Sequence, residues 1–285
     1  MVAKPSTLLV YVRVVIGRAL PWVAVLAFCA WFFSLEASHD RAWSPEQSRL
    51  ARASIEGDRV HLTNVRSFRW RSEGEADERW VERELSLADV TGLDVIVSSW
   101  GWRDLVHTIV SFTVRDADPI AISIESRREV GEPFDPIRGA LRQYEILDVV
   151  ADEEDLFTLR AVHRGERLWL YRTSTEPQVA RRLLRHYLEE LESIADQPAF
   201  YDSFSRNCST ATRAHVAAVG VEDTWDWRVV LNGHVDELLY ERGLLDGSRS
   251  LEELRRESEI TERVRALDGT PGFSSALREG VPTPR

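Results

Sequence analysis

Cysteine is scarce in this sequence of 285 residues, which contains two, Cys29 and Cys208. Cys29 lies inside an apolar run near the N-terminus, so residues 36–285 contain a single cysteine and cannot form an intramolecular disulfide. The sequence also lacks a glycine-rich phosphate loop, an internal repeat and any histidine cluster at metal-ligand spacing. We therefore expect no cofactor and no metal ion, and Cys208 is the candidate for thiol chemistry.

Positive charge is also in short supply. The net charge is −11, and the first 35 residues contribute three positive charges and no acid, which leaves −14 for residues 36–285. Phosphate-backbone binding depends on an excess of Lys and Arg, so nucleic acid is excluded as an expected partner.

Residues 19–35 form an apolar run of seventeen residues without a charge, and Lys4, Arg13 and Arg18 precede it. This run is at the short end of a membrane-spanning helix, and basic residues on its N-terminal side hold that end in the cytoplasm. We expect one transmembrane helix in a bacterial inner-membrane anchor (1–35), a polar linker (36–58) and a periplasmic domain (59–285). A cleaved signal peptide is the alternative, although Leu35-Glu36-Ala37-Ser38 is a poor cleavage site.

The rest of the chain shows the pattern of an α+β domain. Alternating apolar segments predict strands, of which 105–114 and 120–126 form a hairpin across the polar turn 115–119. Further strands are expected at 145–150, 155–163 and 167–172. Helical spacing predicts a helix at 178–195, a helix that begins near Cys208, and helices at 236–242 and 251–267. The prediction is a mostly antiparallel sheet with packed helices that cluster late in the chain.

Cys208 stands at the start of one of these helices. The polar turn residues Ser203, Ser205 and Asn207 lead into it, and a helical stretch follows. The first turn of a helix has unpaired backbone N–H groups, which stabilise a thiolate. The alternative is that Cys208 is a small buried apolar residue and that Asn207 and Ser209 simply cap the helix.

His107 is the candidate base for this thiol. If Val114 pairs with Ile120 across a five-residue loop, His107 lies opposite Arg127 and diagonal to Glu125, on one face of the sheet. A carboxylate near one ring nitrogen fixes the tautomer and leaves the other nitrogen for a nucleophile, so Glu125 is the candidate orienting residue. A histidine that packs in the core or on the surface is the alternative interpretation.

Several short motifs follow one another along the chain. They are Ser98-Ser-Trp-Gly-Trp-Arg-Asp-Leu-Val-His107-Thr, Ile122-Ser-Ile-Glu-Ser-Arg-Arg-Glu-Val-Gly-Glu132, Gly139-Ala-Leu-Arg-Gln-Tyr-Glu145, Asp152-Glu-Glu-Asp155, Leu170-Tyr-Arg172, Asn207-Cys-Ser-Thr210, Leu231-Asn-Gly-His-Val-Asp-Glu-Leu-Leu-Tyr-Glu-Arg-Gly243 and Pro271-Gly-Phe-Ser274. Together, over about residues 60–285, they resemble the Lnb N-terminal periplasmic domain family, which is named for bacterial lipoprotein N-acyltransferases.

The resemblance implies a circularly permuted papain-like fold, with Cys208 as nucleophile and His107 as base. Arg127, Arg128 and Glu132 match an arginine-rich motif of the family. It implies a membrane-anchored cysteine acyltransferase that moves an acyl chain from a phospholipid to a lipoprotein amine through a Cys208 thioester. Trp100 and Trp102 are candidates for lining an acyl slot. The alternatives are a cysteine peptidase or amidase acting on cell-wall peptides, and a non-catalytic periplasmic module that binds a lipid or a lipoprotein.

Overall fold

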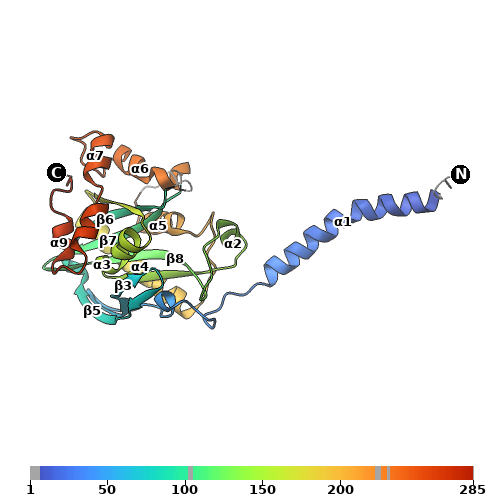
Figure 1. The fold of residues 1–285 in the computed structure, drawn as a ribbon, viewed down its shortest axis with the longest axis horizontal. Coiled ribbons are helices and arrows are strands. Elements are labelled where there is room, and N and C mark those ends of the chain that lie inside the picture. Colours follow the sequence, from blue (N-terminus) through green and yellow to red (C-terminus); the bar gives the residue numbers. More distant parts are fainter. Residues whose placement is uncertain (1–6, 102–104, 222–225, 230–231, 285) are drawn as a thin grey trace. The chain divides into compact units, whose positions relative to one another are not determined.

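The computed structural model describes residues 7–101, 105–221, 226–229 and 232–284, with side chains from residue 18 onward. The chain divides into two compact units, residues 1–38 and 39–285. The first unit is the helix α1 (Thr7–Ser34), which contains Pro21 and leaves eight large apolar side chains between residues 20 and 33 exposed by 41–73% (Figure 1). Within the described part of the chain, no helix has the length and apolarity needed to cross a membrane. The membrane anchor stays a prediction.

The second unit is built on an eight-stranded sheet. Seven strands follow the order β1-β2-β9-β8-β7-β6-β10, and β5 pairs with β2 beside this path. The pair β2–β9 is parallel and the other pairs are antiparallel. The bounds are β1 (Arg52–Glu56), β2 (Arg59–Arg66), β5 (Trp80–Ser86), β6 (Val90–Ser99), β7 (His107–Val114), β8 (Ala117–Arg127), β9 (Glu145–Ala151) and β10 (Arg167–Arg172), with β3 (Arg69–Ser72) and β4 (Glu75–Asp77) in a separate two-stranded sheet.

Both faces of the sheet are buried, because neighbouring residues of one strand enter different cores. Val110 packs with α4 (Pro177–Asp196) and α5 (Cys208–Ala218), and Ile109 packs with α3 (Glu153–Thr158), α8 (Thr261–Leu267) and α9 (Phe273–Leu277). Figure 1 shows β6, β7 and β8 crossing the middle of this unit. The α+β class with a mostly antiparallel sheet is therefore confirmed.

The hairpin of β7 and β8 forms with a different register from the predicted one. Val114 pairs with Ala117 across a two-residue turn in which Asp116 has φ 53°, and Phe112 pairs with Ile120. A β-bulge accommodates the extra residue, and Pro119 lies in it, where its missing N–H interrupts no regular ladder. Continuing the register of Ile109 and Ser123 by two residues places His107 opposite Glu125, not Arg127. Since the error is an even number of residues, every side chain keeps its predicted face.

Two helical regions differ from the sequence prediction. Residues 155–163, predicted as a strand, form the end of α3 and a π-helix, Leu159–His163. Three acids in the first turn of α3 favour a helix start, and burial on nearly all sides hides the helical period. The predicted helix 251–267 is two helices, α7 (Leu251–Glu257) and α8, because residues 258–260 turn to bond β10 through backbone groups.

The remaining short elements surround this framework. Residues expected to form a linker carry a 3-10 helix, Pro45–Gln47, and the edge strand β1. Other 3-10 helices are Leu87–Asp89, Trp227–Val229 and Asn232–His234, and the remaining α-helices are α2 (Pro136–Ala140) and α6 (Val235–Glu241).

Candidate active site

Cys208 is the first residue of α5 and its side chain is buried, with 7% of the residue exposed. Asn207 caps the helix: its Oδ1 accepts hydrogen bonds from Ser209 N (2.9 Å) and Thr210 N (3.0 Å), and Thr210 Oγ1 accepts one from Asn207 N. The cap fixes the direction in which the thiol leaves the backbone. Asn207 takes up the N–H groups of Ser209 and Thr210, so among the described residues the Cys208 N–H is the first-turn donor left for a substrate oxyanion.

His107 begins β7, and helix α5 packs across β7 and β8 beside it. Its Nε2 lies 2.7 Å from Ser123 Oγ and 3.4 Å from Glu125 Oε1. Ser123 Oγ donates to Glu125 Oε1 at 2.7 Å, so the proton order in this chain is imidazole N–H to hydroxyl to carboxylate. Nε2 is therefore a donor, and Nδ1 is the ring nitrogen that remains for the thiol.

Glu125 is held from its other side by Arg160. Arg160 Nη2 donates to Glu125 Oε1 at 2.6 Å, and its side chain is almost fully buried. Arg160 lies in the π-helix, where the sequence predicts a strand. The sequence therefore does not indicate the contact between Arg160 and Glu125. The acidic first turn of α3 was the signal in the sequence that indicated a helix there.

The electrostatics of this group favour a thiolate–imidazolium pair. Burial alone disfavours a charged His107, but the charge of Glu125 and the hydrogen bonds to Cys208 and Glu125 together raise the pKa of His107 to about 9. Burial likewise opposes ionisation of Cys208, yet the hydrogen bond and charge of His107 lower the pKa of the thiol. For Glu125, the charges of His107 and Arg160 overcome burial and hold its pKa well below the usual range. At neutral pH the histidine is thus protonated, and its positive charge shifts the cysteine towards the thiolate.

Asn232 joins the strand of the histidine to the helix of the cysteine. Its side chain bonds both backbone groups of Val106, donating to O (2.7 Å) and accepting from N (3.0 Å). The same Nδ2 lies 2.7 Å from Ser209 Oγ and 3.6 Å from Cys208 Sγ. Asn232 lies in the motif that begins at Leu231, but the sequence assigns it no role. Nothing in the local sequence indicates that it reaches Val106, 126 residues earlier.

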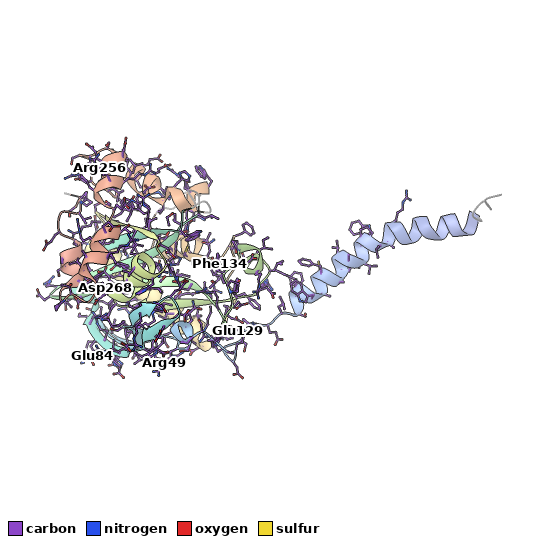
Figure 2. All side chains as sticks on the ribbon, in the orientation of Figure 1. Arg49, Glu84, Glu129, Phe134, Arg256 and Asp268 are labelled. Carbon is purple, nitrogen blue, oxygen red and sulfur yellow. The ribbon has the colours of Figure 1, made fainter. Side chains whose placement is uncertain are left out.

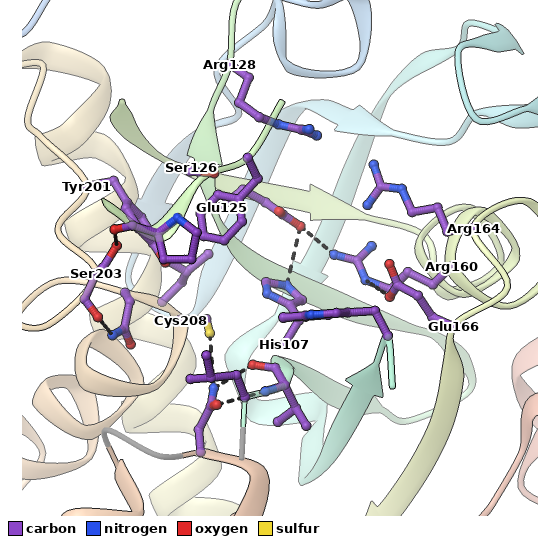
Figure 3. Close-up of a pocket in the computed structure, with 18 of the residues that line it drawn as sticks. His107, Glu125, Ser126, Arg128, Arg160, Arg164, Glu166, Tyr201, Ser203 and Cys208 are labelled. Atoms are coloured by element: carbon purple, nitrogen blue, oxygen red, sulfur yellow. Dashed lines mark hydrogen bonds and ion pairs between the residues drawn. The ribbon is translucent and has the colours of Figure 1, made fainter. Parts of the chain in front are cut away.

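The group opens into a cavity of about 540 Å³. Figure 3 shows Cys208, His107 and Glu125 on its wall, with Arg128, Arg160 and Arg164 beyond Glu125 (Figure 3). Apolar and aromatic side chains also line the cavity; they are Trp100, Leu105, Val106, Ile124, Phe134 and Tyr201. Figure 2 shows Phe134 near α2, where it is partly exposed (Figure 2). A cavity of this size and mixed character is typical of a small-molecule or lipid site.

The structure brings together all three predicted site residues, Cys208, His107 and Glu125. Trp100 also lines the cavity, whereas Trp102 lies outside the described residues. No set of three or more His, Cys, Asp or Glu side chains in the described part of the chain could hold a metal ion.

The arginine-rich motif divides between two places. Arg128 lines the cavity, but Arg127 is buried elsewhere: it donates to Gln47 O (2.9 Å) and Ser48 O (3.0 Å) and lies over the Trp43 ring. Arg127 therefore fastens the segment that precedes β1. Glu132 forms an ion pair with Arg138 and does not line the cavity.

The fold and this site define an α+β domain with a buried cysteine–histidine pair. The family model of the Lnb N-terminal periplasmic domain matches residues 76–233, more than half of the chain, and the protein belongs to this family. Membership implies a periplasmic location for the domain. Comparisons with curated proteins and with solved structures gave no match.

Proposed function

We propose that this protein is a periplasmic cysteine acyltransferase that forms a thioester on Cys208. The observation that carries the proposal is the network Cys208–His107–Ser123–Glu125, in which the thiol pKa is lowered and the histidine is oriented by a buried carboxylate. A circularly permuted papain-like fold is part of the proposal. It is supported by a histidine on a strand that precedes a cysteine at a helix N-terminus.

In the first step, the Cys208 thiolate attacks an ester carbonyl carbon, and the Cys208 N–H stabilises the oxyanion. The ester C–O bond breaks, and the His107 imidazolium gives its proton to the leaving alkoxide. In the second step an amine attacks the thioester. His107 accepts a proton from the attacking nitrogen, and the Cys208 thiolate leaves as the amide forms.

A membrane phospholipid is the proposed acyl donor and a lipoprotein N-terminus the proposed acceptor. The apolar side chains that line the cavity with Cys208, among them Trp100, Ile124 and Phe134, suit an acyl chain. Family membership supports the choice of lipid chemistry over peptide hydrolysis, because the family is named for lipoprotein N-acyltransferases.

Residues 1–35 are proposed to anchor the domain in the bacterial inner membrane by a single span. This is supported by the uncharged run 19–35, by the basic residues before it and by the exposed apolar side chains of α1. An anchor of this kind keeps a periplasmic acyltransferase near its lipid donor.

The proposal is tested by incubating the full chain with bacterial phospholipids and analysing the Cys208 peptide by mass spectrometry. We expect a peptide mass increased by one fatty acyl group and sensitive to neutral hydroxylamine, as a thioester is. Cys208→Ala removes the adduct, His107→Ala reduces it at least a hundredfold, and Cys29→Ala leaves it unchanged. Cys208-dependent cleavage of cell-wall peptides without any acyl adduct would instead establish the hydrolase. Full lipoprotein acylation by Cys208→Ala and His107→Ala variants would establish the non-catalytic module.

A further inference from the structure

Two arginines on the cavity wall have no part in the proposed acyl transfer. They are Arg128, which follows β8, and Arg164, which follows the π-helix. Figure 3 shows both side chains beyond Glu125 as seen from Cys208, with Arg160 and Arg164 on the same side of Glu125 (Figure 3). Their side chains are 21% and 18% exposed, so both are mostly withdrawn from solvent.

The partners of these arginines leave their guanidinium groups poorly neutralised. Among the described residues, the carboxylate nearest to Arg128 is that of Glu46, at 4.0 Å. Arg164 Nε lies 3.2 Å from Glu73 Oε1, but Glu73 is largely exposed, and Nε makes no hydrogen bond among the described residues. Arg160, by contrast, is held by Glu125 at 2.6 Å.

Of the acids on the cavity wall, Glu73 is the one paired with Arg164, and the others are engaged elsewhere. Glu125 is shared by His107 and Arg160, and Glu166 accepts a hydrogen bond from Ser98 and lies 3.9 Å from Arg160. Burial, together with the charges of Arg160 and Arg128, lowers the pKa of Arg164. Like charges gathered in a partly buried wall are unfavourable unless an anion joins them.

We propose that Arg128 and Arg164 bind the phosphate group of the phospholipid donor. The carbonyl group of an acyl ester in the same lipid is then directed to Cys208. This assignment rests on the proposed acyltransferase function. Guanidinium groups suit a phosphodiester because their N–H groups bind two phosphate oxygens at once. In a glycerophospholipid the phosphate and the acyl esters lie on one three-carbon backbone, so a single cavity lined by both arginine and apolar side chains accommodates both.

The test is calorimetric titration of the full chain, kept in an uncharged detergent, with dihexyl-ether phosphatidylglycerol below its micelle concentration. An ether lipid has no ester for Cys208 to attack, so binding is measured without turnover. We expect Arg128→Gln and Arg164→Gln each to weaken binding about tenfold, as loss of a charge-assisted contact does. Lysine at either position should retain part of the affinity. Arg256→Gln, on α7 outside the cavity, is the matched control and should bind like the native protein (Figure 2).

A dihexyl-ether glycerol that lacks phosphate should bind more weakly, and both Gln variants should leave its affinity unchanged. Phospholipid binding that neither Gln variant alters would overturn the assignment. The melting temperature of each variant shows whether it is folded, and Arg128→Gln tests the assignment if the Arg164 variant misfolds. Inorganic phosphate that binds as tightly as the lipid would reassign the site to a free anion. Arginine-dependent lipid binding without any Cys208 adduct would reject the acyl-transfer chemistry and retain the phosphate site.

Discussion

Among the single residues, Glu125 sets the charge of the whole site although it does not touch the thiol. Its carboxylate raises the pKa of His107 to about 9, and the resulting imidazolium lowers the pKa of Cys208. The charges of His107 and Arg160 in turn lower the pKa of Glu125 and keep it ionised despite its burial. The thiolate therefore depends on a chain of three charges, each of which is unfavourable in a buried position without its neighbour.

We expect His107→Asn to raise the pKa of the Cys208 thiol, because burial then acts on it without a neighbouring cation. In the native protein, the rate of Cys208 alkylation by iodoacetamide should rise at a lower pH than that of an ordinary thiol, because the pKa of Cys208 is lowered. In the variant it should rise only above the ordinary thiol pKa of about 8.5. The rate is followed by mass spectrometry of the Cys208 peptide from pH 5 to pH 10. His61→Asn, at an exposed position on β2, is the control.

Glu125→Gln extends this test. Loss of the carboxylate lowers the pKa of His107 from about 9. As the pH rises, the imidazolium in this variant should therefore lose its proton, and with it the ion pair with Cys208, at a lower pH than in the native protein. A Cys208 profile that is the same in the native protein and both variants would show that the thiol ionises independently of this network.

Among the elements, the junction of β7, α5 and the 3-10 helix Asn232–His234 decides whether histidine and cysteine meet. Val106 directly precedes β7, and Asn232 satisfies both of its backbone groups while it also contacts Ser209 and Cys208. One amide side chain thus couples three segments that are more than 20 residues apart in sequence.

Asn232→Ala should lower the free energy of unfolding by about 1–3 kcal/mol, because both backbone groups of Val106 then remain buried without a partner. Urea titration measures this loss. Asn232→Asp keeps the acceptor for Val106 N but adds a negative charge near the thiolate, so it should also raise the pKa of Cys208 in the alkylation profile. Gln143→Ala, which removes an amide bonded to Leu141 O, is the control. An Asp variant that changes stability alone would limit Asn232 to a structural role.

Local signals allowed the elements of the site to be predicted, and contacts distant in sequence were not predicted. The helix start at Cys208 follows from Asn207, and the shared face of His107 and Glu125 follows from the period of a strand even though the register was wrong by two residues. Arg160 was missed because α3 and the π-helix are buried nearly all round, so their apolar residues show no helical period. Asn232 was missed because its role depends on tertiary packing against Val106.

On the scale of the whole molecule, residues 39–285 form a compact unit with their own core, distinct from residues 1–38. The start of this unit is fastened internally: His39 Nε2 lies 2.9 Å from Ile194 O, and Arg127 holds the segment at Gln47 and Ser48. We therefore expect residues 39–285 to fold without residues 1–38.

We expect a chain in which a cleavable signal peptide replaces residues 1–38 to appear in the soluble periplasmic fraction, with Cys208 still reactive. The native chain should stay in the inner-membrane fraction and resist extraction by high salt. Fractionation followed by alkylation of Cys208 tests both statements. A native chain found processed near residue 38 and soluble would show that the N-terminal segment is a leader and not an anchor.

The burial of Cys208 at the wall of one cavity also sets the sequence in which substrates bind and products leave in the proposed reaction. Donor and acceptor both need the same 7%-exposed sulfur and the same 540 Å³ of space. The deacylated lipid must therefore depart before the amine arrives, which is a ping-pong sequence with a waiting acyl-enzyme. During the lifetime of the acyl-enzyme, water competes with the amine for the thioester. The ratio of transfer to hydrolysis therefore depends on how well the bound acyl chain excludes water from the cavity.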